Sequence, residues 1–274
     1  MIVKTVNISK EYALDGNATL KCFLNETDGE LGAYNQNLPA MIVVPGGGYS
    51  WCSLREADPI AIEFFTRHYN TFALDYSVAP YRYPLALTQL ASAVDYVKTN
   101  ANELGVDAER VFVVGFSAGG HLTADLSVEC DDLPVKVAGG KTLNARPKAV
   151  ILSYPVIYPD SHVGSYKNLL GLSDEEATGE KAQTLALDKK VTSSTPPTFI
   201  WTTREDTCVD PTATIRHTQA LQNNGVIYES HIFPYGYHGS ATCDERTLKA
   251  GDRETFEKAN IWFDLADAFC KGLK

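Results

Sequence analysis

The chain has 274 residues, of which 44% are hydrophobic and 21% charged, so it can bury a large core and belongs to neither the disordered nor the fibrous class. The length exceeds that of an average domain, but α/β sheets often reach it, and we expect one domain over residues 1–274. The formal net charge is −10 with no basic cluster, so we expect neither nucleic acid nor an anionic membrane as a partner.

The first predicted elements are two antiparallel strands that form a hairpin. Residues 2–9 and 18–24 place apolar side chains at alternate positions, and Asp15-Gly16-Asn17 between them is a turn sequence. Further along, five short runs are apolar at every position, which is typical of strands buried on both faces. These runs are Ala40–Val44, Thr71–Leu74, Val111–Val114, Ala149–Ser153 and Thr198–Thr202. A final strand is predicted over Val226–Phe233.

Helices are predicted between these strands, each opened by an acidic N-cap residue, a first-turn proline or both. The start signals are Asp58-Pro59, Pro84 and Asp210-Pro211. The second helix keeps its apolar period up to Gly105, and a last helix carries apolar residues at helical spacing from Phe256 to Cys270. The alternation predicts an α/β fold with a mostly parallel central sheet, helices on both faces and the antiparallel N-terminal hairpin at one edge.

One strand-to-helix junction carries a candidate nucleophile. The strand Val111–Val114 is followed by Gly115-Phe116-Ser117-Ala118-Gly119, a G-x-S-x-G motif, and then by a helical pattern. Such a tight turn raises the serine hydroxyl above the sheet, and the flanking glycines remove side chains that would clash. We therefore expect Ser117 to be a catalytic nucleophile, whereas the simpler interpretation is a glycine-rich turn with an N-cap serine.

A serine nucleophile needs a general base and a carboxylate that orients it. Of the six histidines, His238 lies in a loop beyond the final predicted strand, where its side chain can reach the sheet edge. His68 and His217 lie in helical patterns, and His231 lies in a predicted strand. His162 lies in the 155–195 segment, and His121 follows the serine too closely. We expect His238 to be the base.

The loop after Thr198–Thr202 offers three acids for orienting this base. Asp210 precedes a proline and is better used as a helix cap. Asp206 is the predicted triad acid because it follows the carboxyl end of a strand, where functional residues of such sheets gather, and Glu205 is the fallback.

Three glycines follow the strand Ala40–Val44 and can place backbone amides near a reacting atom. We expect the amides of Gly47 and Gly48 to form an oxyanion hole together with that of Ala118. A plain loop or a phosphate cradle is the alternative, but no Gly-Lys-Ser/Thr follows, and position 51 is Trp where a dinucleotide motif needs glycine.

These motifs together resemble the α/β-hydrolase superfamily, in its esterase branch near hormone-sensitive-lipase-like enzymes and acetyl-xylan-esterase-like carbohydrate esterases. The resemblance covers roughly residues 39 to 240 and includes Pro45-Gly46-Gly47-Gly48-Tyr49, Arg55-Glu56-Ala57 and Asp75-Tyr76-Ser77-Val78-Ala79-Pro80. It implies a Ser-Asp-His triad and hydrolysis of carboxylic esters without cofactor or metal. Pro45 stands where the lipase-like branch usually has histidine, which favours the carbohydrate esterases. Glu56 and His121 also match family positions, and we interpret both as structural.

The substrate is expected to be a small ester or an acylated carbohydrate, with acetyl groups on sugars or xylan-derived oligosaccharides favoured. Tyr49, Trp51 and Tyr237 are predicted substrate-binding residues because aromatic faces suit sugar rings. Residues 155–195, rich in Pro, Ser, Gly and charge, are expected to form an insertion or cap over the site. Alternatives are another acyl hydrolase on this scaffold, such as an aminopeptidase or arylformamidase, and a non-catalytic binding module.

The location is expected to be cytoplasmic. No apolar run approaches the ~20 residues of a membrane span, and the first residues lack the apolar core of a signal peptide. The six cysteines lie far apart with no CxxC spacing, so we expect mostly buried thiols and neither a metal site nor a redox pair. An exposed apolar patch within residues 155–195 would indicate a homodimer.

Overall fold

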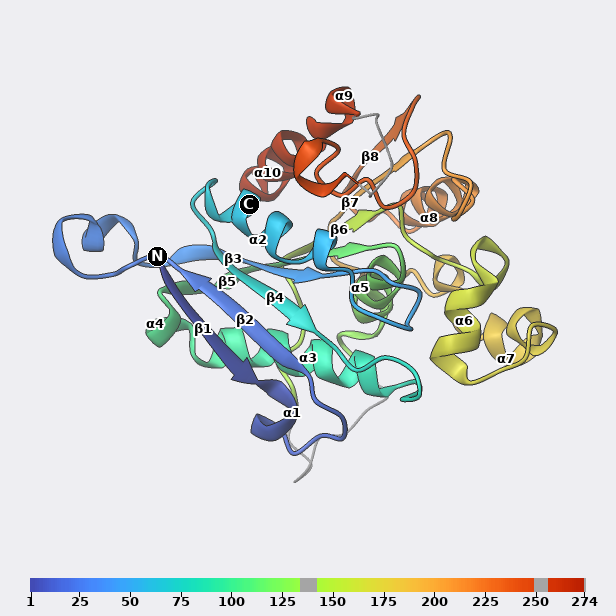
Figure 1. Ribbon diagram of the computed structural model, residues 1–274, viewed down its shortest axis with the longest axis horizontal. Coiled ribbons are helices and arrows are strands. Elements are labelled where there is room, and N and C mark those ends of the chain that lie inside the picture. Colours follow the sequence, from blue (N-terminus) through green and yellow to red (C-terminus); the bar gives the residue numbers. More distant parts are fainter. Residues whose placement is uncertain (134–141, 249–255, 274) are drawn as a thin grey trace.

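The computed structural model describes residues 1–133, 142–248 and 256–273, and in this part the strands form one eight-stranded sheet (Figure 1). The strand order is β1-β2-β4-β3-β5-β6-β7-β8. β1 and β2 are antiparallel, β2 is antiparallel to β4, and every other neighbouring pair is parallel. The strands are β1 Ile2–Asn7, β2 Thr19–Leu24, β3 Leu38–Val44, β4 Asn70–Asp75, β5 Val106–Phe116, β6 Ala149–Ser153, β7 Thr198–Thr203 and β8 Tyr228–Phe233. The predicted sheet with an antiparallel hairpin at its edge is confirmed.

Helices cover both faces of this sheet. α3 and α5 pack on one face, while α2 and α10 pack on the other (Figure 1). The helices are α1 Ile8–Glu11, α2 Asp58–Phe65, α3 Leu85–Thr99, α4 Ala101–Leu104, α5 Ala118–Glu129, α6 Val163–Leu170, α7 Glu180–Gln183, α8 Thr212–Asn223, α9 Glu257–Asn260 and α10 Trp262–Gly272. None of the helices in the described residues is long and apolar enough to cross a membrane.

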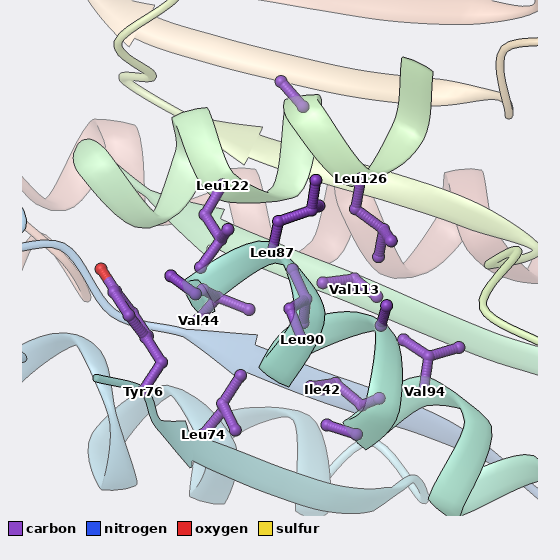
Figure 2. Close-up of a cluster of buried hydrophobic side chains, with 14 of the residues drawn as sticks. Ile42, Val44, Leu74, Tyr76, Leu87, Leu90, Val94, Val113, Leu122 and Leu126 are labelled. Atoms are coloured by element: carbon purple, nitrogen blue, oxygen red, sulfur yellow. The ribbon is translucent and has the colours of Figure 1, made fainter. Parts of the chain in front are cut away.

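The uniformly apolar strands follow from burial on both faces. Successive side chains of a strand point to opposite faces of the sheet. In β3, Ile42 and Val44 belong to the cluster beneath α3 and α5, while Met41 and Val43 belong to the cluster beneath α2 and α10. Figure 2 shows the first cluster, in which side chains of α3 and α5 meet those of β3, β4 and β5. Each position from Ala40 to Val44 therefore needs an apolar residue.

Several predicted boundaries differ from the structure. β5 begins at Val106, five residues before the predicted start, and the last predicted helix, from Phe256 to Cys270, is divided into α9 and α10. The first strand ends at Asn7, because the Asn7 side chain accepts a hydrogen bond of 2.8 Å from the Lys10 amide and caps the short helix α1. The prediction that this strand runs to residue 9 is therefore wrong. The predicted helix up to Gly105 is divided into α3 and α4, and Gly105 ends α4 with φ of 65°. The final strand begins at Tyr228, two residues after the predicted start.

The topology gathers the ends of several strands at one edge. Because β3, β5, β7 and β8 lie in one parallel set, their carboxyl ends meet at the same edge of the sheet. The glycine loop follows β3, Ser117 follows β5, and the loops with Asp206 and His238 follow β7 and β8. The segment 155–195 folds mainly into short helices, among them α6 and α7, and α6 borders the same edge (Figure 1).

Candidate active site

Ser117 occupies a sharp turn between β5 and α5. Its backbone has φ of 53° and ψ of −116°, which is a strained conformation for a residue with a side chain. Its amide donates to the carbonyl oxygen of Ser153 at 3.0 Å and fixes the turn against β6. A Cβ atom on Gly119 would lie 2.2 Å from the carbonyl oxygen of Val44, so only glycine allows α5 to approach β3 this closely.

A chain of two hydrogen bonds joins the serine to a histidine and a carboxylate. The Ser117 Oγ lies 2.8 Å from Nε2 of His238, and Nδ1 of His238 lies 2.6 Å from Oδ2 of Asp206. A carboxylate accepts at Nδ1, so the neutral imidazole carries its proton there, and Nε2 is free to accept the serine proton. The arrangement can activate the hydroxyl for attack on a carbonyl carbon.

Asp206 is held in place by its own loop. Its Oδ1 accepts hydrogen bonds of 2.9 Å from the amides of both Cys208 and Val209, and its side chain is fully buried. The fallback acid Glu205 is half-exposed beside Arg204, at 3.8 Å. The structure thus brings Asp206 to His238, whereas the side chain of Glu205 lies beside Arg204.

Asp210 acts as a helix cap, as its sequence context predicts. Its Oδ1 accepts a hydrogen bond of 2.8 Å from the amide of Thr212, the first residue of α8. This contact satisfies one of the amides that a helix leaves unpaired at its start. Asp210 therefore caps α8, and Asp206 is the acid that contacts His238.

The glycine loop borders the serine. Gly47 has φ of 126° and Gly48 has φ of 62°, both in the left-handed region that favours glycine. In the described part of the chain the amides of these two residues donate to no other group, and both residues line the same cavity as Ser117. Ala118, the first residue of α5, is buried beside the serine. These three amides are therefore the candidate donors to an oxyanion next to Oγ.

Glu56 ties the glycine loop to the rest of the site. Its buried carboxylate accepts a hydrogen bond of 2.9 Å from the Gly46 amide and one of 2.8 Å from the hydroxyl of Tyr154. The Tyr154 hydroxyl in turn accepts from the Ala241 amide at 3.1 Å, and its ring packs edge-on against His238 at 5.0 Å between centroids. Glu56 is thus a positioning residue that couples the glycine loop to the histidine loop.

We expect Glu56→Ala to lower kcat about 10- to 100-fold, because the Gly46 amide and the Tyr154 hydroxyl both lose their acceptor, which displaces the glycine loop. KM is expected to change much less, since the amides of the loop act mainly on the transition state. Steady-state kinetics with 4-nitrophenyl acetate measure both parameters. A variant with unchanged kcat would contradict the positioning role.

His121 forms a second buried network behind the serine. Its Nε2 lies 3.1 Å from the hydroxyl of Tyr166, and its Nδ1 lies 2.8 Å from the hydroxyl of Tyr49. The Tyr166 hydroxyl donates to the carbonyl of Leu185 at 2.9 Å, so it accepts from His121, and Nδ1 accepts from Tyr49. Burial lowers the pKa of His121 to about 3, which keeps the ring neutral. The structural interpretation of His121 agrees with these contacts.

Asp125 lies one turn further along α5 and is also buried, with one carboxylate oxygen that has no hydrogen-bond partner in the described residues. Burial raises its pKa to about 7. Between the ordinary carboxyl pKa and this value the folded chain holds a proton that the unfolded chain has lost, so stability falls as pH rises. We expect this acid to make the protein less stable at pH 8 than at pH 5.

Asp125→Asn is expected to reduce this loss of unfolding free energy between pH 5 and pH 8 by about 2 kcal/mol. Urea unfolding at the two pH values measures the difference, and groups present in both proteins cancel. Asp264→Asn, which removes an exposed carboxylate, is the matched control. Parallel pH profiles for wild type and Asp125→Asn would contradict the expectation.

The serine opens into a cavity of about 380 Å³. Its lining residues are Gly47, Gly48, Ser50, Trp51, Ser53, Arg55, Glu56, Ser117, His162, Gly164, Asn168, Cys208, His238 and Gly239. Trp51 lies at the mouth with 62% of its surface exposed. No group of three His, Cys, Asp or Glu side chains among the described residues is arranged to hold a metal ion.

The two tyrosines predicted to bind substrate lie elsewhere. Tyr49 is 2% exposed with its hydroxyl on His121, and the ring of Tyr237 packs against Phe256 at 5.1 Å between centroids. Neither is among the lining residues of the described cavity, so the structure brings only Trp51 of the three aromatics to it.

Two polar residues of α6 and its N-cap, His162 and Asn168, line the cavity and were missed by sequence reasoning. The only signal in the sequence is a histidine placed to cap a short helix that ends at Gly171. Such a signal predicts the helix, but it does not predict where the helix packs against the sheet.

A larger cavity of about 590 Å³ lies at the opposite edge of the sheet, near Lys98 and Arg146. Its walls include Lys148, Pro197 and Ile227, which precede β6, β7 and β8. The described residues around it supply no hydroxyl, thiol or imidazole side chain. Among the described residues, the hydrogen-bonded pair Ser117 and His238 therefore lies at the carboxyl edge and not at this cavity.

The model of the BD-FAE family matches residues 32–221, which include Ser117 and Asp206. The chain belongs to the BD-FAE family. Among curated proteins, this BD-FAE chain is 34% identical to endo-1,4-beta-xylanase B of Butyrivibrio fibrisolvens over 75% of its length and 33% of the relative's. It is 31% identical to the acetylxylan esterase of Xylanibacter ruminicola over 86% of its length and 45% of the relative's. The BD-FAE chain thus spans less than half of these relatives.

Solved structures match the BD-FAE chain over nearly its full length. The carboxylesterase Cest-2923 from Lactobacillus plantarum is 27% identical with a TM-score of 0.85, covering 100% of this chain and 98% of that one. The acetyl ester-xyloside bifunctional hydrolase from Caldicellulosiruptor lactoaceticus is 28% identical with a TM-score of 0.80, covering 98% and 96%. The predicted α/β-hydrolase fold and its resemblance to esterases of this superfamily are confirmed.

Proposed function

We propose that this protein is a serine carboxylesterase that removes short acyl groups, above all acetyl, from sugars or xylan-derived oligosaccharides. The observation that carries the proposal is the hydrogen-bonded series Ser117, His238 and Asp206 at a cavity that the glycine loop also lines. The acetylxylan esterase and xylanase names of the relatives support the substrate class.

In this mechanism Ser117 Oγ attacks the ester carbonyl carbon while its proton passes to Nε2 of His238. The carbonyl oxygen becomes an oxyanion that accepts hydrogen bonds from the amides of Gly47, Gly48 and Ala118. The bond to the alcohol oxygen then breaks, and His238 returns the proton to the leaving alcohol. A water molecule next attacks the acyl-serine ester, again giving a proton to His238, and the collapse releases the carboxylic acid and restores the Ser117 hydroxyl.

The shape of the cavity supports short acyl groups. The Trp51 indole lies directly against Gly47, since a Cβ atom there would be 2.2 Å from Cδ1 of the ring. The ring therefore limits the space next to the glycine loop, and its exposed face at the mouth suits the apolar face of a sugar. We also propose the cytoplasmic location expected from the sequence.

The test is hydrolysis of 4-nitrophenyl esters from acetate to decanoate, followed by acetate release from acetylated xylo-oligosaccharides. We expect turnover to fall steeply beyond butyrate and to include the acetylated sugars. Comparable turnover of acetate and decanoate would overturn the short-chain part of the proposal. Cleavage of formamides or peptides without ester cleavage would overturn the esterase itself.

A further inference from the structure

One imidazole that lines the cavity, that of His162, has no role in this mechanism. His162 precedes α6, and its Nδ1 lies 3.1 Å from the amide nitrogen of Ser165 and 2.9 Å from the Ser165 hydroxyl. An amide nitrogen can only donate, so Nδ1 accepts this bond and carries no proton. The neutral ring must then hold its proton on Nε2. His162 is therefore a hydrogen-bond donor with a fixed tautomer.

The imidazole ring borders the glycine loop and the cavity. Nδ1 is directed to the first turn of α6, while Cε1, the carbon between the two ring nitrogens, lies 4.0 Å from where a Cβ atom on Gly48 would stand. The ring lines the cavity, and within the described part of the chain its hydrogen bonds are made by Nδ1, so Nε2 has no hydrogen-bond partner there. A substrate oxygen can therefore receive this bond.

The ring also lies beside the loop that follows β7 and carries Asp206, because the carbonyl oxygen of the preceding residue, Ser161, accepts a hydrogen bond of 3.4 Å from the Asp210 amide of that loop. His162 and His238 line the same cavity. Burial lowers the pKa of His162, and the neighbouring charge of His238 lowers it further, while Asp206 acts in the opposite direction. The ring is thus neutral at pH 7 and keeps its proton on Nε2. Because His238 returns its proton to the leaving alcohol, the alcohol part of the ester lies beside His238 in this cavity.

We propose that His162 determines specificity by donating its Nε2 proton to a hydroxyl oxygen on the carbon next to the esterified carbon of the leaving alcohol. The inference rests on the proposed esterase function and extends it to the alcohol part of the substrate. Sugars and other polyols carry such a neighbouring hydroxyl, and simple alkyl alcohols do not. An ester that lacks this hydroxyl leaves the Nε2 donor unpaired in the complex. Its kcat/KM is therefore expected to be lower.

A substitution must separate this role from capping, because His162 also caps α6. In His162→Asn the amide oxygen takes the place of Nδ1 and still accepts from the Ser165 amide, so the cap is kept. The side chain is too short to restore the donor at Nε2. His231→Asn on β8 is the control, since His231 pairs with Glu229 at 2.8 Å and lies outside the cavity lining.

The experiment compares kcat/KM for 2-hydroxyethyl acetate and propyl acetate, followed by acid release in a pH-stat. These esters share the acetyl group and differ by a hydroxyl in place of a methyl on the alcohol. We expect wild type and His231→Asn to favour the hydroxyethyl ester about tenfold, and His162→Asn to bring this ratio close to one. His162→Gln, which returns a donor amide, is expected to recover part of the preference.

Different results would overturn the esterase function and the role of His162. If wild type hydrolyses neither ester nor 4-nitrophenyl acetate, the esterase function itself is overturned. If wild type hydrolyses both esters but His162→Asn leaves their ratio unchanged, only the role of His162 is overturned. If His162→Asn instead changes the ratio between ethyl glycolate and ethyl propionate, the donor serves the acyl part, and the assignment to the alcohol is overturned.

Discussion

Ser117→Ala is expected to lower kcat/KM for 4-nitrophenyl acetate by about 10⁴- to 10⁶-fold, the loss typical of removing the nucleophile from a serine triad. The glycine loop and the substrate cavity remain, so a small activity above the uncatalysed rate is expected to persist. The fold should tolerate the change, because the hydroxyl bonds to His238 and faces the cavity. Circular dichroism and thermal unfolding check the fold, and stopped-time assays at high enzyme concentration measure the residual rate.

His238→Ala provides the internal control for this prediction. Because the serine and the histidine act as a unit, each single variant should lose about as much as the double variant Ser117→Ala/His238→Ala. A fluorophosphonate should label wild type and fail to label Ser117→Ala. Full activity or labelling in Ser117→Ala would show that another group is the nucleophile.

The sheet could be predicted from the sequence because burial on two faces leaves a pattern that needs no long-range information. Every position from Ala40 to Val44 of β3 belongs to one of two apolar layers, so this run of apolar residues is required. The end of β1 could not be predicted, because Ile8 continues the strand pattern while it packs, fully buried, within the helical turn that Asn7 caps. Local capping competes there with strand propensity, and periodicity alone does not decide it.

The site was predicted where the position of a residue follows from strand order. Ser117 and Asp206 follow strands of the parallel set directly, so their edge of the sheet is determined. The position of the Tyr49 ring could not be predicted, because the φ of 58° at this residue turns the ring toward His121 and the core. His162 could not be predicted because its environment depends on where α6 packs, which is a tertiary contact that no local pattern records.

Asp206→Asn is expected to lower kcat about 10⁴-fold, because the hydrogen bonds of Asp206 determine which nitrogen of His238 carries the proton. The amides of Cys208 and Val209 both donate to one side-chain oxygen, so an asparagine must keep its carbonyl oxygen there. Its NH₂ group then faces Nδ1 of His238, which must become an acceptor. The imidazole proton moves to Nε2, where it faces Ser117 and cannot accept the serine proton.

The matched control for Asp206→Asn is Glu205→Gln, the neighbouring carboxylate that sequence reasoning kept as the fallback acid. Its side chain is half-exposed beside Arg204, so we expect kcat within about twofold of wild type. Steady-state kinetics on 4-nitrophenyl acetate measure both variants, and unfolding curves verify that both are folded. A large loss in Glu205→Gln with activity kept in Asp206→Asn would move the orienting role to Glu205, because only the carboxylate that fixes the Nδ1 proton controls the tautomer of His238.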